Sequence, residues 1–284
     1  MPGNIHFATK PEIAAQMIAR ALVAGVPFAW VATDTIYGVG KIEMQLRRAG
    51  TGYGLGAQAT DRFNSWGDKP DVAGTAEQIA QALAPEAWQR LSGGDGTKGP
   101  RLDDWAYVEL ADLEAQEYNA DLTGLWTRGL LIRRNLLTQD LAFFSTWCPA
   151  GTPIDTLVAV EGQRWAIEDA FETAKTELGL THNETRSWHG WHRHVSLVML
   201  AFAMRAVVRQ RANRLPSPQK KRGHQAVALV RWSVQEIRRV ATRLAQRRIE
   251  PAFVIAWSTW RRAHQALAQK SHRKRALRKQ HVQL

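Results

Sequence analysis

Apolar residues in the first sixty positions alternate between two spacings, and this alternation constrains the fold more than any other feature of the sequence. Pro11 to Ala24 has apolar side chains at helical spacing, and Thr9 before it is a residue type that caps helices. The apolar run Phe28 to Thr33 (FAWVAT) predicts a short buried strand. A second helix is predicted over Lys41 to Ala49 and a second strand over Tyr53 to Ala57. Helices that alternate with strands through short turns predict an α/β fold.

The segment from Asp61 to Pro149 has a different texture, with glycine-rich turns between strand-like pieces. These pieces are Trp105 to Leu110, Gly129 to Arg134 and Asp140 to Thr146. We therefore expect a mainly β segment after the first α/β part of the chain.

From Pro153 onward the pattern is helical to the end, with a break expected at Leu215 to Pro218 because two prolines lie there. The longest apolar stretch, Val195 to Met204, is about half as long as a membrane span, so it predicts a buried core helix. The basic run Lys270 to Lys279 is expected to be frayed.

Charge is distributed unevenly along the 284 residues, whose net charge is +12. From Met204 to Leu284 there are 21 Lys and Arg against two acids, whereas residues 1–203 contain 17 Lys and Arg against 24 acids. An acidic body joined to a strongly basic end is typical of a nucleic-acid-binding protein. A basic tail of the ribosomal or membrane-surface kind is the alternative.

Cysteine content and the start of the chain indicate the compartment. Cys148 is the single cysteine, which excludes an internal disulfide and fits a reducing cytoplasm. The first twenty residues lack the pattern of a secretory signal. We expect a cytoplasmic, nucleoid-associated protein without a membrane segment.

The segment Arg164 to Lys175 (RWAIEDAFETAK) contains the strongest local pattern. On a helix, one face is apolar, and Arg164, Glu168, Glu172 and Lys175 form a polar stripe. A carboxylate flanked by cations suits a metal ion held beside a phosphate. An ordinary amphipathic helix with ion pairs one turn apart is the alternative.

Asp34 is the second candidate, because it follows the predicted strand directly. Functional groups of open α/β sheets gather at the carboxyl ends of strands. An Asp at this place also caps turns, and the sequence does not separate the two interpretations.

These residues resemble a known family. Arg164, Glu168 and Lys175, with three and six residues between them, resemble the Arg-Glu-Lys part of the Tyr-Arg-Glu-Lys signature of one large group of DDE transposases. VATDTIYG, Val31 to Gly38, is similar to the second-aspartate motif of the insertion-sequence-seven-hundred-and-one group. The segments GTKGPRLDDWAYVEL, CPAGTP, TRSWHGWHRH and WSTWRRAHQ are also similar to that group, so the resemblance covers nearly the whole chain.

The resemblance implies an RNase H-like core split by a β-rich insertion, with two Asp and one Glu holding two Mg²⁺ ions about 4 Å apart. By position, Asp34 would be the second Asp and Glu168 the Glu, and both would be metal ligands and catalytic. The DNA-binding residues implied or predicted are Arg164, Lys175, Arg193, His194, Arg238, Arg239, Arg261 and Arg262.

Two positions depart from the family pattern. Glu161 stands where the signature has Tyr, three residues before Arg164. The family's first Asp lies on the first strand of the core, but no Asp precedes Asp34 here. We therefore expect an N-terminally truncated protein in which the strand that ends at Asp34 has an unpaired edge, open to aggregation or to pairing with another chain.

The predicted fold is thus α/β: an incomplete RNase H-like catalytic core with a β-rich insertion and a basic all-α C-terminal region. Its expected parts are residues 1–60 (first part of the core), 61–158 (insertion), 159–214 (second part of the core) and 215–284 (basic region). The expected function is DNA strand cleavage and transfer at the terminal inverted repeats of an insertion sequence, inactive in this chain alone. Expected partners are DNA and a second copy or an intact transposase subunit. The alternatives are a non-catalytic DNA-binding remnant that inhibits an intact transposase, and an unrelated RNase H-like nuclease.

Clustered histidines and tryptophans are weaker candidates. His189, His192 and His194 have no Cys or acidic residue at metal-ligand spacing, so a structural or phosphate-facing role is favoured. Trp126, Trp147, Trp188 and Trp191 could stack on an exposed base, but in a chain with 12 Trp core packing is favoured for each.

Overall fold

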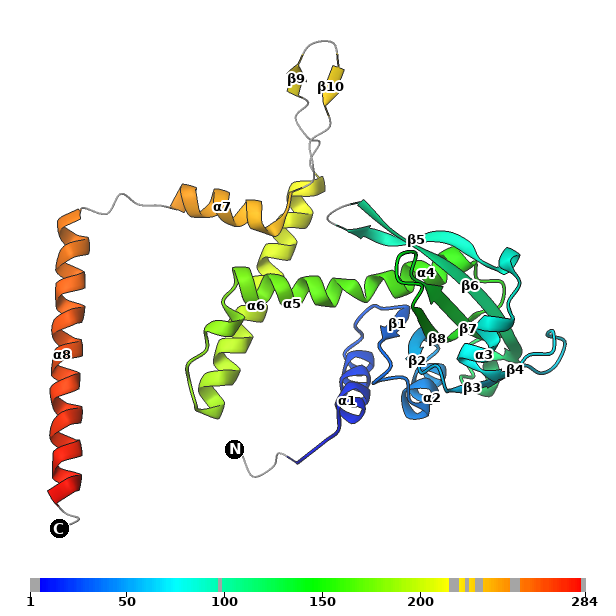
Figure 1. Ribbon diagram of the computed structural model, residues 1–284, viewed down its shortest axis with the longest axis horizontal. Coiled ribbons are helices and arrows are strands. Elements are labelled where there is room, and N and C mark those ends of the chain that lie inside the picture. Colours follow the sequence, from blue (N-terminus) through cyan, green and yellow to red (C-terminus); the bar gives the residue numbers. More distant parts are fainter. Residues whose placement is uncertain are drawn as a thin grey trace. The chain divides into compact units, whose positions relative to one another are not determined.

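The chain forms two compact units, Met1–His194 and Val195–Leu284, each described separately below (Figure 1). The computed structural model describes residues 6–96, 99–214, 220–222, 225–227, 232–245 and 251–281. The first unit is mixed α/β, as predicted.

The first unit begins with the expected succession of helix, strand, helix and strand. These elements are α1 (Lys10–Val23), β1 (Trp30–Thr33), α2 (Gly40–Arg48) and β2 (Gly52–Ala57). Thr9 caps α1 in a reciprocal capping box with Glu12, because its hydroxyl accepts from Glu12 N while the Glu12 carboxylate accepts from Thr9 N. Each predicted boundary is correct to within about two residues.

The following segment is mainly β, as predicted. Its elements are β3 (Arg62–Asn64), β4 (Ala73–Thr75), α3 (Ala76–Ala82), β5 (Gln89–Gly96), β6 (Gly99–Glu114), β7 (Leu125–Arg134) and β8 (Leu141–Pro149), with short 3₁₀ turns at Pro85–Ala87 and Ala115–Glu117. The long strands do not form a sheet of their own. In the described residues they continue the first two strands in one six-stranded sheet, of order β1-β2-β8-β7-β6-β5.

The sheet has one parallel pair, β1 with β2, and every other neighbouring pair is antiparallel. β1 pairs with β2 on one side and is the end strand of the sheet, as expected. An end strand presents a row of backbone N–H and C=O groups that can pair with a further strand.

Strand β2 has different residues on its two faces. Tyr53 and Leu55 point to the side covered by α2, where they pack in one cluster with Ile42 and Leu46. The alternate positions are glycines, which face the opposite side. A β-carbon on Gly54 would overlap the carboxyl of Glu161, so the Glu161 side chain would have to shift to admit one.

Helix α4 (Ile154–Gln163) covers the glycine side of the sheet. Its Leu157 and Val158 pack against Trp105, Leu131 and Phe144. After the single residue Arg164, α5 (Trp165–Glu177) continues the chain, and the 3₁₀ turn Leu180–His182 follows. The predicted Glu-bearing helix is therefore confirmed, with a junction at its first residue.

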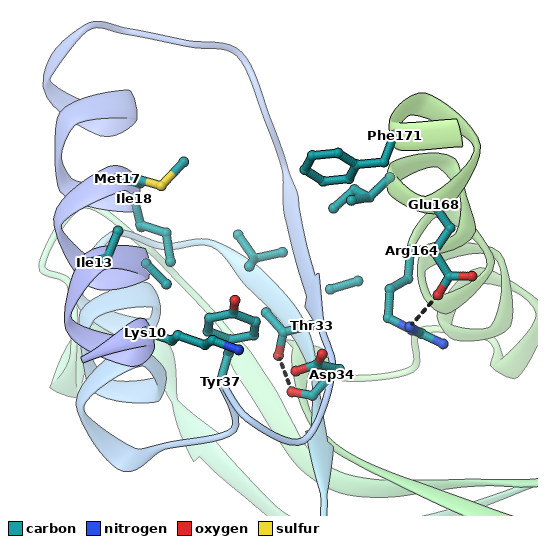
Figure 2. Close-up of a pocket in the computed structure, with 14 residues that line it drawn as sticks. Lys10, Ile13, Met17, Ile18, Thr33, Asp34, Tyr37, Arg164, Glu168 and Phe171 are labelled. Carbon is teal, nitrogen blue, oxygen red and sulfur yellow. Dashed lines mark hydrogen bonds and ion pairs between the residues drawn. The ribbon is translucent and has the colours of Figure 1, made fainter. Parts of the chain in front are cut away.

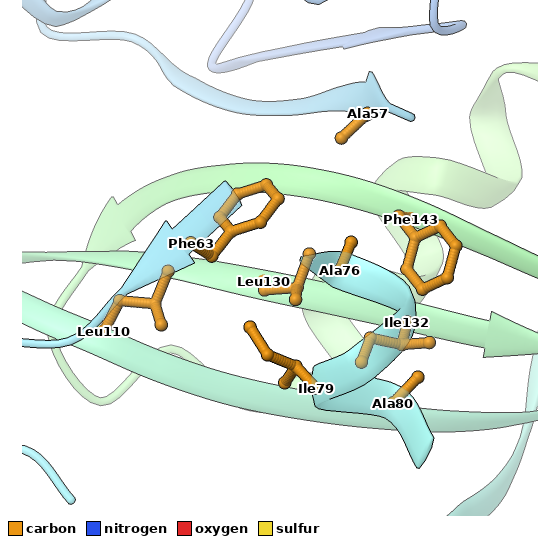
Figure 3. Close-up of a cluster of buried hydrophobic side chains, with 9 residues drawn as sticks. All are labelled: Ala57, Phe63, Ala76, Ile79, Ala80, Leu110, Leu130, Ile132 and Phe143. Carbon is orange, nitrogen blue, oxygen red and sulfur yellow. The ribbon is translucent and has the colours of Figure 1, made fainter. Parts of the chain in front are cut away.

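A further core cluster lies where α3 packs on the sheet (Figure 3). Ile79 and Ala80 of α3 meet Leu130 and Ile132 of β7 there. The insertion tryptophans Trp126 and Trp147 are buried in the cluster on the α2 side, which confirms core packing for these two.

Helix α6 (Trp188–Arg214) continues from the first unit into the second, which also contains α7 (Val234–Ala245), α8 (Pro251–His281) and the strands β9 (Lys220–Arg222) and β10 (Gln225–Val227). The prediction of an all-α C-terminal region is wrong, because β9 and β10 pair as an antiparallel hairpin. Two residues separate these strands in the sequence, which is the length of the shortest hairpin connections. This spacing could have predicted the hairpin, but the region was interpreted only from its basic charge. The expected break at Leu215 to Pro218 lies outside the described residues.

Two other expectations for the second half of the chain are corrected. Lys270 to Lys279 is not frayed, since α8 runs through it. Val195 to Met204 is helical but mostly exposed, with Leu197, Met199 and Leu200 each more than half accessible. A helix with apolar residues on all sides is expected to pack against other elements, but its sequence does not say which elements these are. No helix in the described ranges is long and apolar enough to span a membrane.

Candidate functional site

A cavity of about 560 Å³ lies between α1, β1 and α5 in the first unit (Figure 2). Its walls are mainly apolar, and Ile167 and Phe171 of α5 remain more than half exposed there. The polar side chains that line it are Lys10, Thr33, Asp34, Tyr37, Arg164 and Glu168. The two carboxylates predicted from separate motifs therefore line one cavity.

Asp34 directly follows the end of β1, and its carboxylate also organises the next turn. Its Oδ1 accepts a hydrogen bond from Ile36 N at 3.0 Å, and its backbone carbonyl accepts from Tyr37 N at 3.2 Å. On the β2 side, a β-carbon at Gly56 would overlap the Asp34 backbone, so the two chain segments touch there. Asp34 therefore caps a turn, as one interpretation predicted, and its side chain also lines the cavity.

Glu168 lies in the first turn of α5 and faces Arg164, which stands at the junction with α4. Arg164 Nη1 is 3.3 Å from Glu168 Oε1, and the Glu168 side chain is 54% exposed. An exposed ion pair one turn apart stabilises a protein by only about 0.3–0.5 kcal/mol. Glu168 can therefore change partners at little energetic cost. Lys175 lies two turns further along α5 and does not line this cavity.

The carboxylate pair fits a hard divalent cation in part. Mg²⁺ prefers carboxylate oxygens and retains several waters when it binds proteins. Asp34 and Glu168 supply two such groups, but Arg164 is paired with one of them. Among the described residues, no group of three or more His, Cys, Asp and Glu side chains is placed to hold a metal ion.

Glu161 is a residue of this region that the sequence identified only as a departure from the family signature. It lies one helical turn before Arg164 on α4 and is 3% exposed. Neither carboxyl oxygen has a hydrogen-bond partner among the residues that the structure describes. Burial raises the pKa of Glu161 to about 8, although the positive charges of Arg164 and Arg133 oppose this shift. The sequence signal that could have found it was Gly54, since glycines at alternate strand positions indicate close approach by another group.

A second, smaller cavity of about 40 Å³ surrounds the Glu161 carboxyl. Its charged lining residues are Arg101, Asp103, Arg133, Glu161 and Arg164. Arg164 therefore lines both this cavity and the larger one with Asp34 and Glu168. The sequence motif placed Arg164 beside phosphate, whereas in the structure it pairs with Glu168 and its positive charge also acts on Glu161.

Two histidines of the HGWHRH segment, His192 and His194, have backbone partners. A ring nitrogen of His194 lies 3.0 Å from the Gly179 carbonyl, and His192 Nδ1 lies 3.1 Å from the Trp188 carbonyl. His192 also stacks on Trp188 at 4.2 Å between ring centroids. These contacts agree with the structural role favoured from the sequence. Arg193 is exposed on α6.

The other predicted DNA-binding arginines belong to the second unit. Arg238 and Arg239 are exposed on α7, and Arg261 and Arg262 are exposed on α8. Arg239 lies 3.5 Å from Glu236, and because both side chains are exposed this ion pair is weak. All four guanidinium groups are therefore accessible to a polyanion.

The geometry defines an α/β unit in which two carboxylates and an arginine share a cavity beside an end strand, followed by a unit with accessible arginines. No protein-family model and no curated protein matches the chain. The function is therefore argued from the residues and their geometry.

Proposed function

We propose that this chain is a DDE-type insertion-sequence transposase polypeptide with an RNase H-like first unit. One observation supports this most strongly: Asp34 and Glu168, chosen from motifs far apart in the sequence, line the same cavity. The strand order adds support, because β1, which Asp34 directly follows, is parallel to β2 and ends at the cavity.

Each cavity residue has a role in this function. Asp34 and Glu168 would hold Mg²⁺, which when bound would supply a Lewis acid for phosphoryl transfer. Arg164 neutralises a phosphate oxygen once it leaves Glu168, and Lys175 adds positive charge further along the same helix face.

The chain by itself is incomplete for cleavage under this proposal. Two-metal phosphoryl transfer requires ligands that place both ions, and the cavity contains two carboxylates where the family uses three. A strand added to the edge of β1 would lie beside Asp34, so a further chain could supply the third carboxylate there.

The first test is metal binding, measured by calorimetry with Mn²⁺ and Mg²⁺ on the full chain. We expect binding that is lost in Asp34→Ala and in Glu168→Ala. The matched controls are Glu172→Ala, an exposed carboxyl one turn along α5, and Asp61→Asn, a turn-capping aspartate elsewhere. Binding that is unaffected by either cavity substitution contradicts the assignment of the site.

The second test is DNA cleavage with duplexes that contain inverted repeats from the DNA flanking the coding sequence. We expect binding but no nicked product with either metal. Nicking that disappears in both Asp34→Ala and Glu168→Ala would show that the site is complete, and the incompleteness would then be rejected.

A non-catalytic DNA-binding remnant is the second candidate function. The observation that favours it is the Arg164–Glu168 ion pair, which occupies one of the two carboxylates. A remnant of this kind binds DNA through the second unit and inhibits an intact transposase. It is distinguished by DNA binding that is unchanged in Asp34→Ala, together with the absence of metal binding.

A further inference from the structure

Arg164 lies between two carboxyl groups of very different exposure. On the solvent side it pairs with Glu168, which is 54% exposed. It also lines the small cavity that surrounds Glu161, one helical turn earlier in the chain. The guanidinium of Arg164 is thus close to the carboxyl groups of both Glu168 and Glu161.

The Glu161 carboxyl is buried, and the protein does not satisfy its hydrogen-bonding groups. Both oxygens are buried, and no described residue forms a hydrogen bond with either of them. An ionised carboxylate in such surroundings costs several kcal/mol unless a positive charge pairs with it. The carboxyl of Glu161 therefore has two states of low energy: neutral, or ionised with a guanidinium against it.

The charged groups that face Glu161 come from β6, β7 and the α4–α5 junction, and they are Arg101, Asp103, Arg133 and Arg164. Arg101 Nη2 already donates to two backbone carbonyls, of β5 and α4, at 3.2 Å each. Burial raises the pKa of Asp103. The positive charge of Arg133 and a hydrogen bond with the backbone of Leu136 act in the opposite direction and lower this pKa. Arg133 attracts the Glu161 carboxylate from a central strand. Arg164 is the cation whose present partner is exposed and weakly bound.

We propose that Glu161 is a positioning residue that serves as the second, buried partner of Arg164. When another group engages Glu168, Arg164 turns onto the Glu161 carboxyl, whose O–H bond breaks and whose proton passes to solvent. Arg164 stays cationic throughout, so the protein loses one proton in the exchange. When Glu168 is free again, Arg164 returns to it and Glu161 takes a proton from solvent. The exchange itself requires no metal ion, and only its use during cation binding at Glu168 rests on the proposed function.

The test removes the competing partner and measures the titration of the Glu161 carboxyl. In Glu168→Gln, Arg164 has lost its exposed partner, and we expect the midpoint of Glu161 to fall by roughly one to three pH units. The measurement is carbon NMR of the full chain with labelled Glu carboxyl groups. The signal of Glu161 is assigned as the one that is missing in Glu161→Gln.

Glu172→Gln is the matched control, because it removes an exposed carboxyl from the same helix one turn further on. It should leave the Glu161 midpoint unchanged. Arg164→Gln should raise the midpoint, and Arg164→Lys should raise it less, because a positive charge remains. An unchanged midpoint in Glu168→Gln, or an equal fall in Glu172→Gln, overturns the proposal. Since Glu168 is exposed, its replacement keeps the core intact.

Discussion

Replacement of Glu161 by Gln tests the most unusual electrostatic feature of the first unit. The substitution keeps the shape of the side chain and removes its ability to ionise. Burial raises the pKa of Glu161 from the ordinary value of 4.5 to about 8. The folded protein therefore retains a proton between these pH values, whereas the unfolded chain releases it.

The sign and size of the effect follow from proton linkage. Below about pH 4.5 both states are protonated, so Glu161 imposes no penalty on the fold. As the pH rises toward 8, the unfolded state alone ionises, and the free energy of unfolding of the wild type falls by about 1.4 kcal/mol per pH unit. The total loss is about 5 kcal/mol, a large part of the stability of an ordinary domain. Glu161→Gln removes this loss.

The assay is urea unfolding followed by tryptophan fluorescence at a series of pH values between about 4 and 9. We expect the two proteins to differ least at the acidic end, and the variant to become progressively more stable than the wild type up to about pH 8. Glu172→Gln, an exposed replacement, should follow the wild type throughout. Parallel curves for wild type and Glu161→Gln would show that Glu161 is ionised in the folded protein, and the reasoning from its burial would be refuted.

Three further predictions address packing, DNA binding and the sheet edge. Gly54→Ala places a β-carbon against the Glu161 carboxyl and should lower the free energy of unfolding by about 1–3 kcal/mol, whereas Gly40→Ala, which meets nothing within 4 Å, should not; urea unfolding measures both. Arg261→Ala combined with Arg262→Ala should weaken DNA binding and reduce the slope of log affinity against log salt by roughly 0.9 for each phosphate that is no longer neutralised, measured by fluorescence anisotropy; a wild-type curve that is flat with salt contradicts this. Thr33→Lys places a charge on the end strand and should reduce concentration-dependent self-association in sedimentation experiments. Equal association of variant and wild type would show that self-association does not use the edge of β1.

Local elements could be predicted from the sequence because their signals are local. The capping pair Thr9 and Glu12, the spacing of α1 and the apolar run of β1 are each complete within a few residues. The second unit departs from prediction where the local signal was ambiguous. The short hairpin of β9 and β10 was not predicted, because the region was interpreted from its basic charge. The apolar helical run Val195 to Met204 is mostly exposed, although a buried helix was predicted.

The candidate site was predictable in its residues but not in its geometry. Asp34 and Glu168 were identified from motifs, and the cavity they share depends on how α5 and β1 are positioned by the rest of the first unit. The sequence left open whether Arg164 pairs with Glu168 one turn away or points freely to a phosphate, and the structure shows the ion pair. Such pairing depends on side-chain rotamers in a three-dimensional environment.

The sequence by itself determined the elements, the order of α/β and β-rich parts, the uneven charge and the candidate carboxylates. Only the tertiary structure decided that β8 joins β2, which makes the expected insertion part of one sheet. The same packing lays α4 across Gly54 and buries Glu161, which in the sequence is simply an acid on a helix. The physical reason is that sheet order and desolvation arise from contacts between residues distant in the chain, whereas helical and strand periodicity arise from neighbours.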